Sequence, residues 1–221
     1  MLKAVIFDLD GTLIDSTEAI VQSFMHTFDV LGYARPERAE VVRTIGFTLE
    51  QHFELFTKHD PHECARIYRA HYGAIALDLT TMLPGCRETL DVLRARGLKL
   101  GFATSKQKKY ADLILDHLGV LGHFDSCIGP DEVTHPKPHP EAVLTSLAHL
   151  DVSADEALFV GDTDFDVKAA HAAGVRCLCV TTGYNTREQL EALNPAGVFE
   201  TMNALTEHLL ASNELDEADV A

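Results

Sequence analysis

Two aspartates, Asp8 and Asp10, follow a short apolar run near the start of the sequence and precede Gly11 and Thr12. Residues two apart on a strand project from the same face, so both carboxylates are expected at one strand end, within about 7 Å of each other. Carboxylates this close repel each other unless a cation or a proton lies between them. Their oxygens suit a hard divalent cation such as Mg²⁺, so the pair is a candidate metal site.

Groups that can bind phosphate occur at two later points. Thr104 and Ser105 end an apolar run and precede a helical pattern, where a hydroxyl and free backbone N–H groups can hold a phosphate. Taken alone, such residues are more often only a helix N-cap. Lys137 lies between two of the three prolines of a loop at 135–140. Prolines stiffen a loop and disfavour a helix, so this lysine is expected to point into a cleft.

Three further aspartates, Asp162, Asp164 and Asp166, follow an apolar run and Gly161. Helix capping by acids in a first turn explains part of this pattern, but not three acids directly behind a strand. Asp162 and Asp166 are four residues apart, so they can lie on the same side of a helix N-terminus. With the earlier motifs they form a set of carboxylates, a hydroxyl and a lysine that suits a divalent cation and a phosphoryl group.

Short apolar runs that alternate with helical patterns position these motifs. The runs cover 4–7, 98–103, 126–128, 157–160 and 176–180. Strands that alternate with helices predict an α/β fold with a doubly wound parallel sheet and helices on both faces. Because the carboxyl ends of parallel strands meet at one edge of the sheet, the motifs are expected to converge there.

One segment interrupts this alternation with helical spacing and no convincing strand. Its helices are expected to begin with Asp15 as an N-cap, at Thr48 and at Pro61. We therefore predict an all-helical cap domain at 15–80, inserted at the edge of the sheet where ligands bind.

The remaining residues are assigned to the core and to a tail. The α/β core is predicted to comprise 1–14 and 81–211, and the crossings near Asp15 and at 80–83 are expected to be hinges. Residues 212–221 contain four acids, so they are predicted to form a flexible acidic tail.

The composition excludes several classes of protein. The chain has 221 residues, 46% of them hydrophobic, so it can bury a core. It has 34 acidic and 18 basic residues and a formal net charge of −16, which argues against nucleic-acid binding because that requires a basic surface. No apolar run approaches the roughly 20 residues of a membrane-spanning helix. The N-terminal run also meets Asp8 too early for a signal peptide, so no membrane partner is expected.

The five cysteines form no CxxC motif. Cys177 and Cys179 are two apart in an apolar run, so they are expected to be buried thiols on one face of a strand. Reduced thiols and the lack of an export signal predict a cytoplasmic protein.

The motifs DLDGT (8–12), ATS (103–105), Lys137 in its proline-rich loop and GDTDFD (161–166) resemble the four motifs of the haloacid dehalogenase superfamily. The resemblance covers nearly the whole chain and includes a helical cap after the first motif. The chain is most similar to the phosphoglycolate phosphatase-like branch. This resemblance implies a Rossmann-like core, Mg²⁺ as cofactor, and a small soluble substrate such as a phosphoglycolate-like monoester or pyrophosphate.

The resemblance also implies roles for the residues that meet the substrate. Asp8 is expected to be the nucleophile that forms an aspartyl-phosphate, and Asp10 the general acid and base. Thr104, the Ser105 N–H and Lys137 are expected to bind the phosphoryl oxygens. The enzyme is expected to be a monomer or a homodimer.

The resemblance places Mg²⁺ on Asp8, the backbone carbonyl of Asp10, and Asp162. Asp166 is expected to hold a water on the metal or to orient Lys137.

The cap contributes two candidate substrate-facing residues. Gly46 resembles the cap-loop glycine that lets the backbone approach the leaving group, and Arg43 is a candidate for binding a carboxylate or second phosphate.

An acid at position 10 favours phosphate-ester hydrolysis over C–halogen or C–P cleavage within the superfamily. A sugar phosphomutase of the same fold is the alternative, although the basic cap-loop pattern expected for it is missing from the sequence. More remote alternatives are a non-catalytic phospho-receiver and a scaffold protein. The position of Asp8 on the first strand and the helical insertion argue against a receiver.

Overall fold

The computed structural model describes residues 1–212, and its centre is a six-stranded sheet. The spatial order of the strands is β5-β4-β1-β6-β7-β8, and every neighbouring pair is parallel. The strands are β1 (Ala4–Phe7), β4 (Lys99–Ala103), β5 (Ser126–Ile128), β6 (Ala157–Gly161), β7 (Arg176–Val180) and β8 (Gly197–Phe199). This confirms the predicted α/β fold, with the first five strands correct to within one residue. The sequence did not predict β8, whose three residues are only half-buried and carry no alternating pattern.

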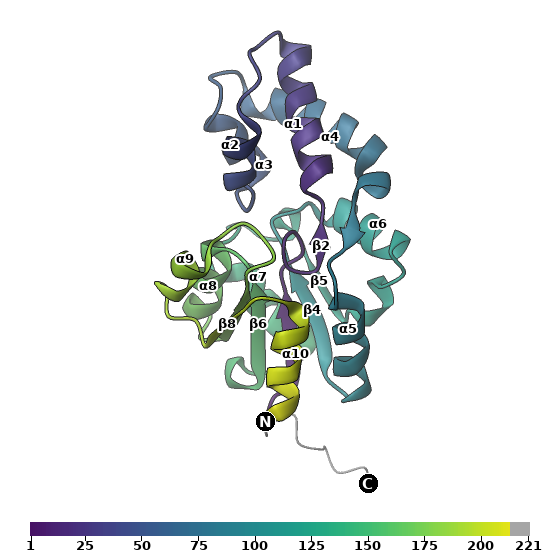
Figure 1. Ribbon diagram of the computed structural model, residues 1–221, viewed down its shortest axis with the longest axis vertical. Helices are drawn as coiled ribbons and strands as arrows, with labels where there is room; N and C mark the ends of the chain where they lie inside the picture. The colour runs from purple at the N-terminus through teal and green to yellow at the C-terminus, as the bar shows by residue number, and fades with distance from the viewer. Residues whose placement is uncertain (213–221) are drawn as a thin grey trace.

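Helices cover both faces of this sheet (Figure 1). Side chains of β1 alternate between the faces, so Val5 and Phe7 join one apolar cluster while Ala4 and Ile6 join the other. The first cluster includes residues of α5 (Cys86–Ala95), α6 (Lys108–His117) and α10 (Met202–Ala211). The second includes residues of α7 (Glu141–Leu150), α8 (Asp164–Ala172) and α9 (Arg187–Glu191). Short 3₁₀ turns lie at Leu121–His123, Pro130–Glu132 and Ala154–Glu156.

Four helices form a separate layer above the carboxyl edge of the sheet (Figure 1). They are α1 (Thr17–Leu31), α2 (Arg38–Arg43), α3 (Leu49–Glu54) and α4 (Pro61–Leu79). Aromatic packing joins them, with the Phe24 ring of α1 stacked on Phe53 of α3 at 4.4 Å between centroids. The Thr48 side chain caps α3, and Pro61 is the first residue of α4, as the sequence indicated.

The two connections between the helical layer and the sheet lie side by side. β2 (Ile14–Asp15) pairs antiparallel with β3 (Thr81–Met82). This pairing corrects the expected start of α1, because Asp15 is held in β2 and Ser16 takes the N-cap position. The Asp15 carboxylate still accepts a hydrogen bond from Thr17 N at 3.0 Å.

The two cysteines of β7 lie next to each other in the core. Cys177 and Cys179 are fully buried on β7, with sulfurs 4.0 Å apart, as expected. Residues 213–221, which hold nearly all of the predicted acidic tail, lie outside the described residues. Among residues 1–212, no helix is long and apolar enough to cross a membrane.

Candidate active site

The order of the strands brings the motifs together at one edge of the sheet. β1 lies between β4 and β6, so Asp8, Thr104 and Asp162, which follow these strands directly, emerge next to one another. The loop between β5 and α7 carries Lys137 to the same edge. The predicted convergence of the four motifs is therefore a consequence of the parallel topology.

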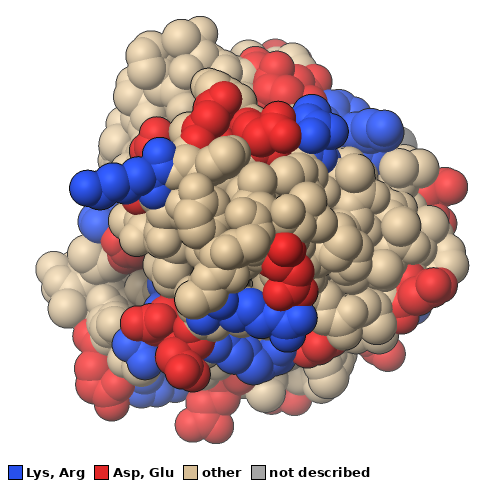
Figure 2. Space-filling view, turned by 90° about the horizontal axis from the view of Figure 1, so that it is seen from above, with Lys and Arg blue, Asp and Glu red and all other residues tan. Residues whose placement is uncertain are grey.

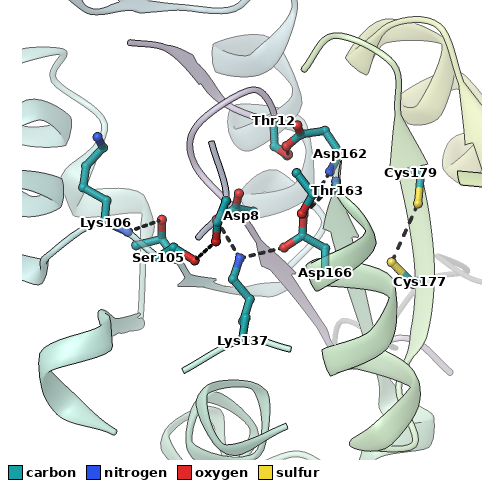
Figure 3. Close-up of polar contacts among 12 residues, drawn as sticks. Asp8, Thr12, Ser105, Lys106, Lys137, Asp162, Thr163, Asp166, Cys177 and Cys179 are labelled. Carbon is teal, nitrogen blue, oxygen red and sulfur yellow. Dashed lines mark hydrogen bonds and ion pairs between the residues drawn. The ribbon is translucent and has the colours of Figure 1, made fainter. Parts of the chain in front are cut away.

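The Lys137 ammonium group lies between two carboxylates at the centre of the site (Figure 3). Its Nζ is 2.9 Å from Asp8 Oδ1 and 2.6 Å from Asp166 Oδ1, and only 3% of the side chain is exposed. Burial by itself lowers the pKa of Lys137, but the charges of Asp166 and Asp8 raise it above its usual value. Lys137 is therefore a fixed positive charge beside Asp8.

The loop that holds Lys137 is fastened by a carboxylate at the start of α7. Glu141 accepts hydrogen bonds from the backbone N–H groups of Thr134 and His135, at 2.8 and 3.0 Å. The His135 ring also contacts Glu141, at 3.0 Å from Nδ1 to Oε2. These contacts close the proline-rich loop and fix the backbone on the N-terminal side of Lys137.

Asp166 is oriented by the N-terminus of α8. Its Oδ2 accepts hydrogen bonds from Thr163 Oγ1 at 2.7 Å, Thr163 N at 3.0 Å and Asp162 N at 3.2 Å. Its other oxygen, Oδ1, contacts Lys137. Asp166 is expected either to hold a water on the metal or to orient Lys137. Its contact with Lys137 is the one that the second role requires.

Asp162 is held from two sides and needs glycine backbone around it. Its Oδ1 accepts a hydrogen bond from Thr12 Oγ1 at 2.7 Å, and its Oδ2 accepts one from Tyr184 N at 3.0 Å. A Cβ at Gly11, where φ is +84°, would lie 2.6 Å from Asp162 Oδ2, and one at Gly183 would lie 1.8 Å from it. Only glycine lets these two loops approach the carboxylate.

The donor set at this point suits a divalent cation. Asp8, Asp162 and Asp166 are buried, and each offers an oxygen within 4.8 Å of the others. Burial raises the pKa of Asp8 to about 6, and it holds the pKa of Asp162 well above its usual range together with the charges of Asp166 and Asp8. Three buried carboxylates against the single charge of Lys137 leave an excess of negative charge. Oxygen ligands of this kind are those that Mg²⁺ prefers, and the cluster includes Asp8 and Asp162, the two carboxylates predicted as metal ligands.

Asp10 has an environment different from that of Asp8. Its Oδ2 lies 3.0 Å from Lys106 Nζ, and its Oδ1 accepts a hydrogen bond from the Ser16 hydroxyl. Lys106 also donates to Tyr72 OH at 2.7 Å. Lys106 is not among the site residues predicted from the sequence. Its position directly after the ATS motif was the available signal, but its partner Tyr72 in α4 could not be inferred from spacing.

Thr104 and Ser105 lie at the end of β4, with different contacts. Thr104 is buried, and its Oγ1 accepts a hydrogen bond from Lys106 N at 3.2 Å. Ser105 Oγ donates to the backbone oxygen of Gly46 at 2.8 Å. This bond joins the sheet to the helical layer at the mouth of the site.

A pocket of about 290 Å³ lies between the sheet and the helical layer. Asp8, Asp10, Thr104 and Ser105 line its floor, and Gly46 lines its cap side, as expected. Arg43 does not line the pocket and is exposed at the end of α2. The structure thus does not support a substrate-facing position for Arg43, because the chain turns between α2 and Gly46 and leaves the arginine in solvent.

Seen from the cap end, the surface carries acidic and basic side chains side by side (Figure 2). Lysine and arginine do not form a continuous basic surface on this face. This mixed distribution agrees with the acidic composition of the chain.

Known proteins are similar to this chain in sequence and in fold over nearly its full length. Residues 5–180 match the family of haloacid dehalogenase-like hydrolases. The pyrophosphatase PpaX of Bacillus velezensis is 35% identical over 92% of this chain and 94% of its own. The phosphoglycolate phosphatase of Salmonella typhimurium is 30% identical over 92% of this chain and 91% of its own.

A solved structure agrees with these sequence relatives. The haloacid dehalogenase-like family hydrolase of Streptococcus pneumoniae superimposes with a TM-score of 0.85 and 26% identity, over 94% of this chain and 98% of that one. Together, the comparisons confirm the family and the phosphatase class expected from the four motifs. The chain belongs to the haloacid dehalogenase-like hydrolase family.

Proposed function

We propose that this phosphatase is a Mg²⁺-dependent hydrolase of a small soluble phosphate, acting through an aspartyl-phosphate on Asp8. The observation that carries the proposal is the position of Lys137 Nζ, 2.9 Å from Asp8 and 2.6 Å from Asp166. A carboxylate repels an anionic phosphoryl group, and a fixed ammonium group beside it reduces this repulsion.

In the first step, a carboxylate oxygen of Asp8 attacks phosphorus and the bond between phosphorus and the leaving oxygen breaks. Asp10 gives a proton to that oxygen, so the leaving group departs as an alcohol or as phosphate. In the second step, water attacks the phosphorus of the aspartyl-phosphate while Asp10 takes its proton. Inorganic phosphate leaves and Asp8 is regenerated.

Lys137, the Thr104 hydroxyl and the Ser105 N–H are proposed to bind the phosphoryl oxygens. Asp8, Asp162 and the Asp10 carbonyl are proposed to hold Mg²⁺, and Asp166 to orient Lys137. When bound, the cation supplies positive charge that offsets the repulsion between Asp8 and the substrate. Ser16 and Lys106 hold the Asp10 side chain so that it faces the pocket.

The proposal is tested by release of inorganic phosphate from a panel of phosphomonoesters and pyrophosphate, with Mg²⁺ and with EDTA. We expect turnover that needs Mg²⁺ and that Asp8→Asn abolishes. Asp164→Asn is the matched control, because Asp164 lies half-buried at the first turn of α8 and pairs with Lys168. Turnover that survives in Asp8→Asn would refute the mechanism.

The sugar phosphomutase alternative gains no support from the cap. Arg43 is exposed, and both cationic side chains lining the described pocket are already paired with carboxylates. The absence of a stable phospho-enzyme during steady-state turnover would separate a hydrolase from a mutase.

The cellular location and the oligomeric state of the protein stay predictions. Five free thiols support a cytoplasmic enzyme. A monomer or a homodimer is expected, and light scattering after size exclusion tests this.

A further inference from the structure

Aromatic and aliphatic side chains line much of the cap side of the pocket, where the leaving group of a substrate would lie. Beyond Asp8 and Asp10, the lining includes Tyr68, Tyr72, Tyr110 and Tyr184, together with Phe47 and several aliphatic side chains. A volume of about 290 Å³ is near the lower end of the roughly 300–1,000 Å³ of small-molecule sites. The pocket therefore has room for a leaving group with a ring.

Each cation that lines the described pocket is already neutralised. Lys106 Nζ lies 3.0 Å from Asp10, with its side chain only 6% exposed. Arg69 Nη2 lies 2.6 Å from Glu50 Oε1, and both side chains are 29% exposed. Asp131 adds a further carboxylate to the lining. Outside the phosphoryl-binding end, the pocket therefore offers no excess positive charge.

This charge arrangement disfavours a leaving group that is itself anionic. The carboxylate of phosphoglycolate or the second phosphate of pyrophosphate would have to take Arg69 or Lys106 from its present partner. Removing one member of a partly buried ion pair leaves an uncompensated charge. An uncharged leaving group meets no such cost.

Aromatic side chains contribute to the pocket lining to different extents: Tyr110 and Tyr184 are half-buried, whereas Tyr68 and Tyr72 are only 7% and 2% exposed. Tyr68 and Tyr72 are stacked, with centroids 5.4 Å apart, and Tyr110 meets Tyr72 edge to face at 5.3 Å. Contacts within the cap and core fix these rings: Tyr72 OH binds Lys106, and Tyr110 OH donates to the backbone oxygen of Arg69 at 2.8 Å. Such fixed rings favour offset or edge-on packing of another ring.

We propose that the substrate is a phosphomonoester of an uncharged, ring-bearing alcohol, in contrast to the substrates for which the relatives PpaX and phosphoglycolate phosphatase are named. The proposal rests on the phosphohydrolase function above. The phosphoryl group meets Asp8 and Lys137, and the ring of the leaving alcohol packs in the pocket beside the parts of Tyr68, Tyr72 and Tyr110 that line it.

The test compares kcat/KM, with Mg²⁺, for benzyl phosphate, adenosine 5′-monophosphate, methyl phosphate, phosphoglycolate and pyrophosphate. Benzyl phosphate, methyl phosphate and phosphoglycolate all release an alkyl alcohol, so they separate the effects of ring and charge. We expect benzyl phosphate and adenosine 5′-monophosphate to exceed phosphoglycolate and pyrophosphate at least tenfold, and benzyl phosphate to exceed methyl phosphate.

A variant tests the role of the ion pair. Glu50→Gln leaves Arg69 without its carboxylate partner, so we expect kcat/KM for phosphoglycolate to rise at least threefold relative to benzyl phosphate. Glu54→Gln removes the same charge from an exposed position on the same helix, and it should leave this ratio unchanged.

The outcomes separate the two proposals. If phosphoglycolate or pyrophosphate equals or exceeds the ring-bearing substrates, the inference on the leaving group is wrong and the phosphohydrolase function stands. If methyl phosphate equals benzyl phosphate, the part assigned to the aromatic residues is wrong. If none of the phosphates is hydrolysed, the function itself is wrong.

Discussion

Lys106 and Asp10 form a largely buried ion pair, with Lys106 Nζ 3.0 Å from Asp10 Oδ2 and side-chain exposures of 6% and 12%. Burial by itself lowers the pKa of Lys106, but the charge of Asp10 and the contact with Tyr72 raise it above its usual value. The Lys106 ammonium also lies 4.7 Å from the centre of the Tyr72 ring. Tyr72 is in the cap, so a single lysine connects the proposed acid–base residue with the helical layer.

Replacing Lys106 is expected to reduce turnover by affecting Asp10. In Lys106→Met, Asp10 loses its charged partner but stays in place, so we expect kcat to fall by about 10-fold to 100-fold, at or below the lower end of general acid–base effects. The pH profile of kcat should shift as well, because the charge beside Asp10 is gone. Lys109→Met is the control: Lys109 is exposed, and its removal should change neither kcat nor the profile. An unchanged pH profile in Lys106→Met would contradict the proposed positioning role.

Replacing Asp8 is expected to stabilise the metal-free protein while removing its activity. Burial raises the pKa of Asp8 from 3.8 to about 6, so the folded protein holds this proton more tightly than the unfolded chain does. Stability is therefore lost as the pH rises from about 4 to about 6, and the loss is complete above that range. The difference corresponds to about 3 kcal/mol.

Urea denaturation in EDTA tests this expectation. Asp8→Asn should be more stable than the parent by about 2 to 3 kcal/mol at pH 7.5, with little difference at pH 4. Adding Mg²⁺ should stabilise the parent and narrow the gap, because a ligand that binds only the folded state raises its stability. An Asp8→Asn variant less stable than the parent at pH 7.5 would show that the carboxylate is not destabilising.

His52 is expected to make the cap sensitive to acid. Its ring is buried against Phe24, with centroids 4.5 Å apart, and contacts the Thr44 hydroxyl. Burial lowers the pKa of His52 from 6.5 to about 4. The unfolded chain then binds the proton first as the pH falls, so stability decreases from about pH 6.5 to about pH 4, by about 3 kcal/mol in total.

Variants isolate this contribution from that of the other histidines. Denaturation of His52→Gln between pH 7.5 and 4.5 should show a shallower dependence on pH than the parent, whatever its stability at neutral pH. His62→Gln changes an exposed histidine and should keep the parent slope. Equal slopes in His52→Gln and the parent would mean that His52 is already charged in the folded cap.

The two cap residues identified from the sequence are expected to behave differently. Gly46 has φ of +117°, and a Cβ there would lie 3.2 Å from the Phe165 ring. Gly46→Ala should therefore strain the loop by about 1–3 kcal/mol and displace the backbone oxygen that Ser105 binds, lowering kcat/KM about tenfold. Arg43→Ala removes an exposed side chain outside the pocket, so kcat/KM should stay within twofold of the parent. A large loss in Arg43→Ala would restore it as a substrate-binding residue.

The strands β1, β4, β5, β6 and β7, and the residues that follow them, could be predicted from the sequence alone. Each signal is local: an apolar run buried on both faces, then glycine, acids or hydroxyls. Once the strands are parallel, Asp8, Thr104 and Asp162 must meet at one edge, so the floor of the site also followed from the sequence.

The cap residues that face this floor could not be predicted in the same way. The contact between Lys106 and Tyr72 and the one between Ser105 and Gly46 join segments 34 and 59 residues apart. The pairing of Arg69 with Glu50 depends on how α4 packs against α3. Helical periodicity places a residue on the buried or exposed side of its own helix. It does not say which buried side chain from another segment will be its partner, because that depends on how the helices pack in three dimensions.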